Sequence, residues 1–291
     1  MRNKIGGRQL LASPYLLWMV GFTIIPLVVI VRKAFTDAGG NFTFDNITAI
    51  ADHINLKSFI FSLEIAAGCT VICILLAYPL VMALRRIGMS RGSFTLFFLI
   101  LPMWMNFILR ILAWQMILSP NGILNFMLTS IHLPATNIAN TPAAIMIGVV
   151  YDYFPYMMLP IFTAVSEIDE GIIESAKDLG ANGFTTFRKV ILPLSMPGLK
   201  SGITMVFVPS MTSFVIADLL GGGKLQLIGN IIEQEFTRNS DWGLGSGLSV
   251  SLMVFVLLSM ALTSGKIGVG KRVRLAASEE EIKAEAEAAA K

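Results

Sequence analysis

The stretch ESAKDLGANGFTTFRKVILP, residues 174–193, decides how this chain is interpreted. It is polar and charged, yet it interrupts a sequence that is otherwise dominated by long apolar runs. Glu174-Ser175-Ala176 is followed after three residues by Gly180, and after nine more by Val190-Ile191-Leu192-Pro193. This layout predicts a helical hairpin that stands outside an apolar body.

The composition is that of a membrane protein. The chain has 291 residues, of which 55% are hydrophobic and only 14% charged, and its mean hydropathy is +0.72. A soluble domain has about 25% charged residues. A helix of roughly 20 apolar residues crosses the hydrocarbon core, and no ten-residue polar/apolar alternation suggests a barrel. We therefore predict an all-α polytopic membrane protein with six transmembrane helices. The six apolar runs are Leu10–Val31, Ile65–Leu84, Ser93–Leu109, Thr141–Val165 (broken by Asp152), Ser201–Ala217 and Trp242–Gly265.

Charge distribution predicts the orientation of these spans. Most of the 22 basic residues lie in the segments 2–8, 85–91, 177–200 and 266–291. By the positive-inside rule, both termini and the 174–193 hairpin are expected in the cytoplasm. The first apolar run is longer than a signal-peptide core of about 7 to 15 residues, so we expect it to be retained. We expect a transmembrane domain over 1–275, containing a cytoplasmic loop at about 166–195, and a charged cytoplasmic tail over 276–291.

The loop has the pattern of an amphipathic helix followed by a second, shorter one. Ser166 with Asp169 or Glu170 resembles a capping start, and Gly180 supplies a stop. A second helix is expected after Asn182-Gly183. The expected apolar stripe consists of Ile168, Ile172, Ala176 and Leu179, and the opposite side carries Glu170, Glu174 and Asp178. Such a hairpin suits burial against a partner protein; the alternative is a helix on the membrane surface with solvated acids.

Residues 174–193 resemble the EAA motif of bacterial ABC importer permeases, with Ser175 in place of alanine and Val190 in place of isoleucine. In that family the loop is the handle through which an ATPase moves the membrane subunit. The resemblance implies coupling roles for Glu174, Ser175, Ala176, Gly180, Leu192 and Pro193.

Wider stretches are similar to the first permease subunit of the spermidine/putrescine importers. These stretches are 42–46, 101–106, 110–111, 218–222, 227–230 and 241–242. The similarity implies the type I importer permease fold, in the bacterial inner membrane. It also implies three kinds of partner: a dimer of ATP-binding subunits that use ATP and Mg²⁺, a second permease, and an extracytoplasmic polyamine-binding protein. Transport is expected to proceed by alternating access.

The chain shows no catalytic motif of its own. The nearest match to a phosphate-binding loop, Gly223-Lys224, has Asp218 where the first glycine belongs and Leu225 where serine or threonine belongs. We therefore expect no catalytic residue and no bound cofactor, with ATP used by the partner. Cys69 and Cys73 lack neighbours at ligand spacing, so no metal site is predicted. The basic residues form short juxtamembrane clusters, which argues for contact with lipid rather than nucleic acid.

Ionisable residues at bilayer depth are candidates for the substrate path, because burying them in hydrocarbon is costly. These are Glu64, Asp152 and Asp218, with Trp104 and Tyr153 as aromatic companions. Carboxylates and aromatic faces suit an organic cation. In the alternative interpretation Arg110 neutralises Glu64 or Asp152, and the aromatic residues serve packing.

Two other functions remain open. The first keeps the class but changes the cargo to an iron chelate, a phosphonate or another anion. The second is a secondary transporter or an intramembrane enzyme, which the absence of repeats and of a Ser/His or paired-Asp constellation in the sequence makes less favourable.

Overall fold

The computed structural model describes residues 14–15, 17–37, 39–87, 97 and 100–263. The chain divides into two compact units, residues 1–254 and 255–291. Of the second unit only the end of the last helix is described. The expected tail 276–291 and residues 10–13 of the first expected span lie outside the described residues. Across the described part, the single β pairing is an isolated antiparallel bridge between Thr36 and Phe42.

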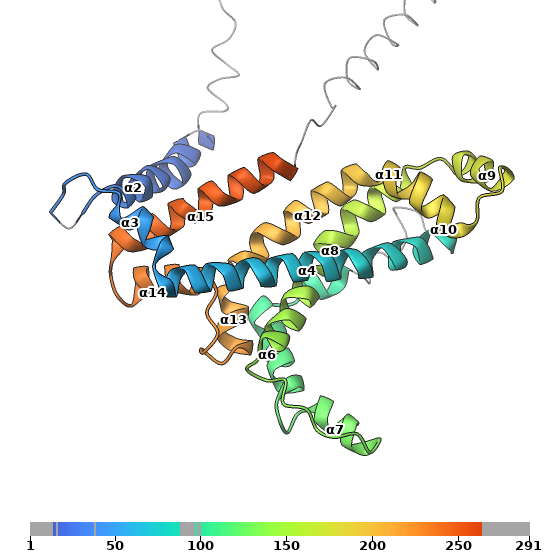
Figure 1. Ribbon diagram of the computed structural model, residues 1–291, viewed down its shortest axis with the longest axis horizontal. Coiled ribbons are helices and arrows are strands. Elements are labelled where there is room, and N and C mark those ends of the chain that lie inside the picture. Colours follow the sequence, from blue (N-terminus) through green and yellow to red (C-terminus); the bar gives the residue numbers. More distant parts are fainter. Residues whose placement is uncertain (1–13, 16, 38, 88–96, 98–99, 264–291) are drawn as a thin grey trace, which may run out of the picture. The chain divides into compact units, whose positions relative to one another are not determined.

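The described residues are almost entirely helical (Figure 1). In chain order the elements are η1 (Val20–Ile24), α2 (Ile25–Ala34), α3 (Asp45–Thr48), η2 (Ala49–Ala51), α4 (His53–Arg86), η3 (Leu101–Trp104), α6 (Phe107–Leu118), α7 (Ile123–Ser130), α8 (Pro142–Ser166), α9 (Glu170–Asp178), α10 (Gly183–Thr186), η4 (Phe187–Ile191), α11 (Leu192–Leu194), α12 (Met196–Met211), α13 (Phe214–Leu220), α14 (Ile228–Thr237) and α15 (Trp242–Thr263).

Five helical segments in this part of the chain are long and apolar enough to cross a membrane: Leu17–Ala34, His53–Arg86, Phe107–Ser130, Pro142–Ser166 and Trp242–Ala261. A sixth is obtained if Gly183–Leu194 and Met196–Met211, which meet at a bend of 70°, are taken as one broken span. The prediction of an all-α polytopic membrane protein is confirmed.

The third predicted span, Ser93–Leu109, lies partly outside the described residues, because 93–96 and 98–99 are not described. Among the described residues, an apolar helical segment long enough to cross a membrane runs from Phe107 to Ser130. The predicted run stops before Arg110 only because it was defined as an uncharged run. In the structure Arg110 forms an ion pair with Asp152, so the helix continues through it.

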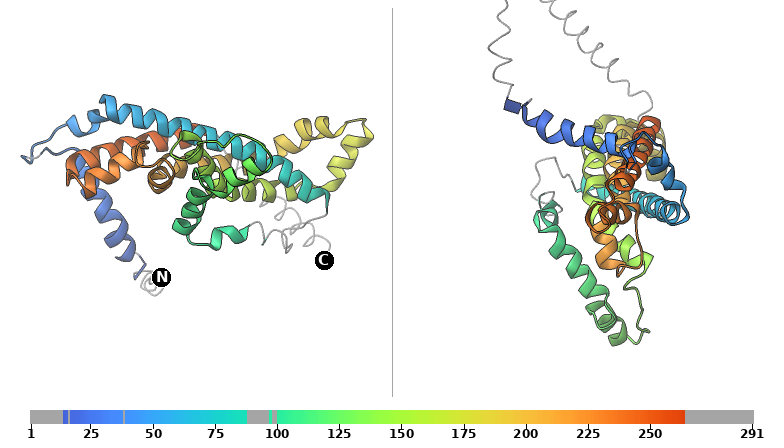
Figure 2. Two further views of the ribbon diagram at one scale, coloured as in Figure 1. Left: turned by 90° about the horizontal axis from the view of Figure 1, so that it is seen from below. Right: turned by 90° about the vertical axis from the view of Figure 1, so that its left-hand side faces the viewer.

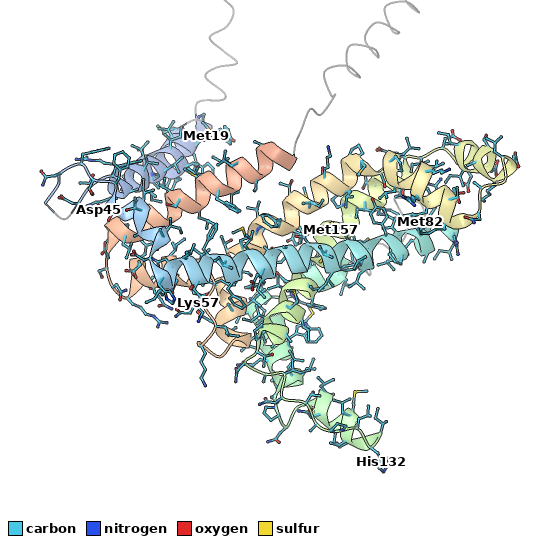
Figure 3. The ribbon with its side chains drawn as sticks, viewed as in Figure 1. Met19, Asp45, Lys57, Met82, His132 and Met157 are labelled. Carbon is cyan, nitrogen blue, oxygen red and sulfur yellow. The ribbon has the colours of Figure 1, made fainter. Side chains whose placement is uncertain are left out.

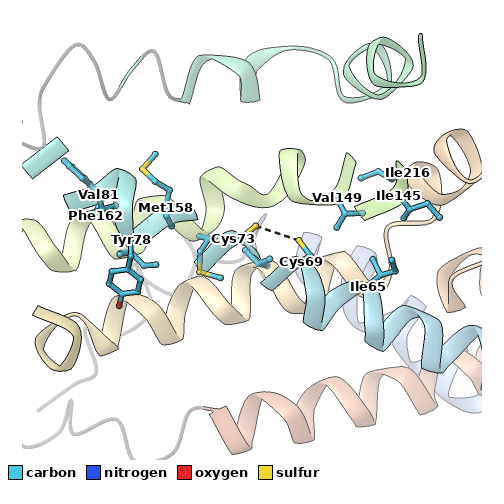
Figure 4. Packing of buried hydrophobic residues seen from close by; sticks show 14 of the residues in the cluster. Ile65, Cys69, Cys73, Tyr78, Val81, Ile145, Val149, Met158, Phe162 and Ile216 are labelled. Atoms are coloured by element: carbon cyan, nitrogen blue, oxygen red, sulfur yellow. Dashed lines mark hydrogen bonds between the residues drawn. The ribbon is translucent and has the colours of Figure 1, made fainter. Parts of the chain in front are cut away.

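The core of unit 1 lies among α4, α8 and α12, which pack side by side (Figure 1). Gly198 and Gly202 of α12 face the backbone of α8 so closely that a Cβ atom would collide with Pro160 or Met157. Figure 4 shows the packing between α4 and α8, with Cys69 and Cys73 buried among apolar side chains. Their sulfur atoms are 3.9 Å apart, and both residues serve as small apolar groups.

Candidate coupling loop and buried polar groups

The first helix of the loop is defined at both ends by local hydrogen bonds. The Asp169 carboxylate accepts a hydrogen bond from the Gly171 N–H (2.7 Å), so Asp169 is the N-cap of α9. Ser166, one of the predicted caps, is instead the last residue of α8, and that part of the prediction is wrong. At the other end Gly180 has a φ of +83°, and its N–H donates to the Lys177 carbonyl (2.8 Å). The Ala181 N–H donates to the Ala176 carbonyl (3.0 Å), which completes a Schellman motif. The predicted end of the helix at Gly180 is confirmed.

The second half of the loop returns the chain to the core. The Asn182 side chain accepts a hydrogen bond from the Thr185 N–H (2.8 Å) and caps α10, the expected second helix. A π-helical turn and the short α11 follow, and Leu192 and Pro193 lie in α11. The chain then bends at Ser195 into α12. The end of the motif therefore marks the joint between the loop and a membrane helix. Figure 2 shows α9 and α10, in yellow, beyond one end of α4 and α8.

The apolar residues of the loop divide between two faces. Ile168 and Ile173 are each only 8% exposed and pack inward, whereas Leu179 is 89% and Phe184 70% exposed. The prediction of a single apolar stripe is therefore wrong. Ile168 precedes α9, and the Ile172 side chain is 48% exposed and does not share the buried face of Ile173. Glu170, Glu174, Ser175 and Asp178 are exposed as well, and Ala176 is half-buried. The outer face thus combines large apolar groups with carboxylates.

Two polar contacts from α4 hold the ends of this loop. The Arg85 guanidinium donates to the Val165 carbonyl and to the Ile168 carbonyl (2.8 Å), just where α8 ends. The Tyr78 hydroxyl lies 3.0 Å from the Ser195 hydroxyl at the bend, and the Tyr78 ring meets the Phe187 ring edge-on with centroids 5.3 Å apart. Sequence reasoning missed both contacts, since each joins residues about 80 or more positions apart.

A buried ion pair joins α6 to α8. Arg110 and Asp152 are in contact, and their side chains are 11% and 9% exposed. Arg110 also lines a largely apolar cavity of about 670 Å³, together with Trp114, Tyr151 and Phe154. Of the two predicted partners for Arg110, the structure selects Asp152. A role for Asp152 in the substrate path stays a prediction, and its charge is already matched by the guanidinium.

Asp218 belongs to a second polar cluster, centred on the fully buried Asn230 of α14. The Asn230 amide donates to the Asp218 carboxylate (2.7 Å) and to the Phe214 carbonyl (3.0 Å), and its oxygen accepts from the Leu227 N–H (2.9 Å). Nearby, the Ser62 hydroxyl of α4 accepts from the Ile228 N–H (2.7 Å). Residues 227–230 belong to the stretches that resemble the importer permeases, but the sequence alone assigns Asn230 no role.

The other predicted path residues lie elsewhere. The Tyr153 hydroxyl lies 3.3 Å from the Ser213 hydroxyl, at the break between α12 and α13. Glu64 is exposed and lines a separate cavity of about 710 Å³ with Lys57 and Lys224. Trp104 is 77% exposed and meets Phe97 edge-on. Asp152 and Tyr153 are adjacent in α8, whereas Glu64, Trp104 and Asp218 lie in α4, η3 and α13, and a path role for each stays a prediction.

The sequence of this chain over residues 79–265 matches the family described as the binding-protein-dependent transport system inner membrane component. The chain belongs to this family, which agrees with the motif at 174–193. A spermidine/putrescine transport system permease protein, PotB, from Haemophilus influenzae is 37% identical over 83% of this chain and 87% of its own length. PotB from Escherichia coli is 34% identical over 84% of this chain and 91% of its own length.

The fold is shared with solved ABC transporters. A chain in the crystal structure of a bacterial alginate ABC transporter, in complex with an alginate pentasaccharide-bound periplasmic protein, superposes with a TM-score of 0.72. The match covers 88% of this chain and 91% of that one at 14% identity, a level that establishes the fold alone. This chain therefore has the type I ABC importer permease fold.

Proposed function

We propose that this chain is the membrane subunit of an ATP-driven importer that receives polyamines from an extracytoplasmic binding protein and moves them into the cell. The observation that carries the proposal is the 37% identity, over 83% of this chain, to a relative named for spermidine and putrescine transport. The cargo follows from that relative's name, and the class of protein follows from the family.

The outer face of the loop supports a protein partner at this position. Leu179 and Phe184 expose large apolar surfaces next to the carboxylates of Glu174 and Asp178. Exposed apolar groups rimmed by charge are typical of an interaction site. The partner in this proposal is a dimer of ATP-binding subunits on the cytoplasmic side, which use ATP and Mg²⁺, and a second permease completes the membrane body. Both termini then lie in the cytoplasm.

Transport follows from the way the loop is joined to the membrane helices. Closure of the ATPase dimer displaces α9, and the displacement passes through Tyr78, Ser195 and Arg85 to α4, α8 and α12. ATP shifts the balance between outward- and inward-facing states only through its different affinity for the two. The chain's own residues transmit this motion and perform no chemistry.

Among the acidic residues, Asp218 suits a cationic substrate better than Asp152. The hydrogen-bond partner of Asp218 is the neutral Asn230, which does not compensate its charge, whereas Asp152 is paired with Arg110. A carboxylate held in position by an amide is suited to pair with an ammonium group at an otherwise apolar depth.

Uptake of labelled spermidine and putrescine, by cells that express this chain with its partner subunits, tests the proposal. We expect Asp218→Asn to raise the KM for uptake about tenfold or more, since a charge-assisted hydrogen bond is worth about 1.5–3 kcal/mol. Asp52→Asn, at an exposed acid without a side-chain cap bond, is the matched control and should leave the KM unchanged. Uptake of an iron chelate or an anion in place of polyamine would contradict the cargo and leave the class intact.

A further inference from the structure

A small cavity lies between the end of α4 and the inner side of the loop. Its volume is about 260 Å³, and its lining includes Met82, Arg85, Arg86, Glu170, Lys177 and Thr186. Figure 3 labels Met82 on the last turns of α4, next to α10. A water molecule takes up about 30 Å³ in the liquid, so the cavity has room for a small polyatomic ion with water.

The charges around this cavity favour an anion. Arg85 and Arg86 approach from α4 and Lys177 approaches from α9, against the one carboxylate of Glu170. Arg85 is held in place because it donates to the Val165 and Ile168 carbonyls. A guanidinium has five N–H donors, so these two bonds leave three for other acceptors.

An independent observation points to the same kind of ligand. The Thr186 side chain lines the cavity and the residue is only 4% exposed, yet its hydroxyl is buried without a hydrogen-bond partner in the described part of the chain. A buried hydroxyl without a partner is unfavourable, and such groups are rare in folded proteins. An acceptor oxygen in the cavity would satisfy it.

The depth of the cavity matches that of lipid phosphates. The apolar run of α4 from Ile65 to Leu84 is about 30 Å long at 1.5 Å per residue, which is the thickness of the hydrocarbon core. Arg85 and Arg86 follow directly, so they lie at the level where headgroups begin. We propose that this cavity binds a phosphate group, held by Arg85, Arg86, Lys177 and the Thr186 hydroxyl. An anionic phospholipid headgroup and a soluble phosphate are its two sources.

Such a ligand would link the end of α4 to Lys177 and Thr186 of the loop. The direct hydrogen bonds of Arg85 and Tyr78 go instead to Val165, Ile168 and Ser195. It leaves the exposed outer face, with Leu179 and Phe184, accessible. The inference therefore requires only that α4 spans the membrane, and it does not depend on the cargo or on the ATPase.

Binding is measured by native mass spectrometry on the full-length chain in a neutral detergent, with phosphatidylglycerol, phosphatidylcholine or inorganic phosphate as the probe. We expect phosphatidylglycerol to bind more tightly than phosphatidylcholine. Arg86→Gln, Lys177→Gln and the near-isosteric Thr186→Val should each weaken this binding about tenfold or more. Arg188→Gln and Lys189→Gln, exposed on the same loop and outside the cavity lining, are matched controls and should bind as the unmodified chain does.

The other measurements distinguish a lipid phosphate from a soluble phosphate and test whether the cavity binds an anion at all. Binding of inorganic phosphate without phosphatidylglycerol, with the same dependence on Thr186, would support the site and assign it to a soluble ion. Equal binding of both lipids, or equal losses in cavity and control variants, would overturn the proposal. Glu170→Gln should tighten binding because it removes a repelling charge; a loss of thermal stability with no gain in binding would show that Glu170 itself is the anion that the basic groups hold.

Discussion

The loop and the membrane-embedded polar groups differ in how their structure is determined. In the loop, each boundary depends on residues a few positions apart, as Asp169 with Gly171 and Gly180 with Lys177 show. Two buried or half-buried charges of the membrane body instead depend on another helix, as Arg110 does on Asp152 and Asp218 on Asn230. The loop is therefore built from local signals, whereas the buried Arg110–Asp152 pair depends on how α6 packs against α8.

The largest loss of stability is expected at the buried ion pair, where a partner on another helix compensates the charge of Asp152. Arg110→Leu leaves the Asp152 carboxylate buried and uncompensated, and breaking a buried pair in this way costs about 3–5 kcal/mol. We expect most of the protein to be lost from the membrane, as measured by immunoblot and by the thermal midpoint in detergent. The double variant Arg110→Leu with Asp152→Leu removes both charges and should recover much of that loss. Equal losses in the single and double variants would show that the pair does not act as a unit.

The next effect should fall on function rather than on the amount of protein. Gly180→Ala forces a side chain into a backbone of φ +83°, at a strain of about 1–2 kcal/mol concentrated in the loop. We expect uptake to fall severalfold while the amount in the membrane is retained. Gly183→Ala is the matched control, because that glycine needs no positive φ and a Cβ there meets nothing within 4 Å. Similar losses in both variants would contradict the role of the Schellman turn.

A charge reversal on the outer face separates partner binding from folding. Glu174 is exposed, so Glu174→Lys should change the free energy of unfolding by no more than about 0.5 kcal/mol and leave the thermal midpoint nearly unchanged. Uptake and co-purification of an ATPase subunit should both be lost. Asp52→Lys, an exposed charge reversal far along the chain, should affect neither. Full uptake by the Glu174 variant would remove this face as the site of the partner.

The contrast between the two regions also explains how far the sequence could predict the structure. Residues 174–193 predicted the loop, its stop at Gly180 and the second helix at 183, because each follows from short-range chemistry. The sequence could not choose between Glu64 and Asp152 as the partner of Arg110, since the pair that forms joins residues 42 positions apart. The role of Asn230 was missed for the same reason. The buried Asn230 side chain makes hydrogen bonds to the start of α14 and to a carbonyl of α13, but in the sequence it cannot be told from any asparagine near a helix start.

The smallest expected effect lies at the joint between the two regions. Tyr78→Phe removes the hydroxyl that meets Ser195 at the bend between loop and α12, while it keeps the ring contact with Phe187. A net loss of about 0.5–1.5 kcal/mol is expected for one such hydrogen bond. A double-mutant cycle with Ser195→Ala, read by both thermal midpoint and uptake, isolates the pair. If the contact transmits motion, uptake should show a coupling between the two substitutions that exceeds their coupling in stability. Because Ser195 also bonds the Leu192 carbonyl, additive effects in both measurements would place its role within the loop and not at the joint.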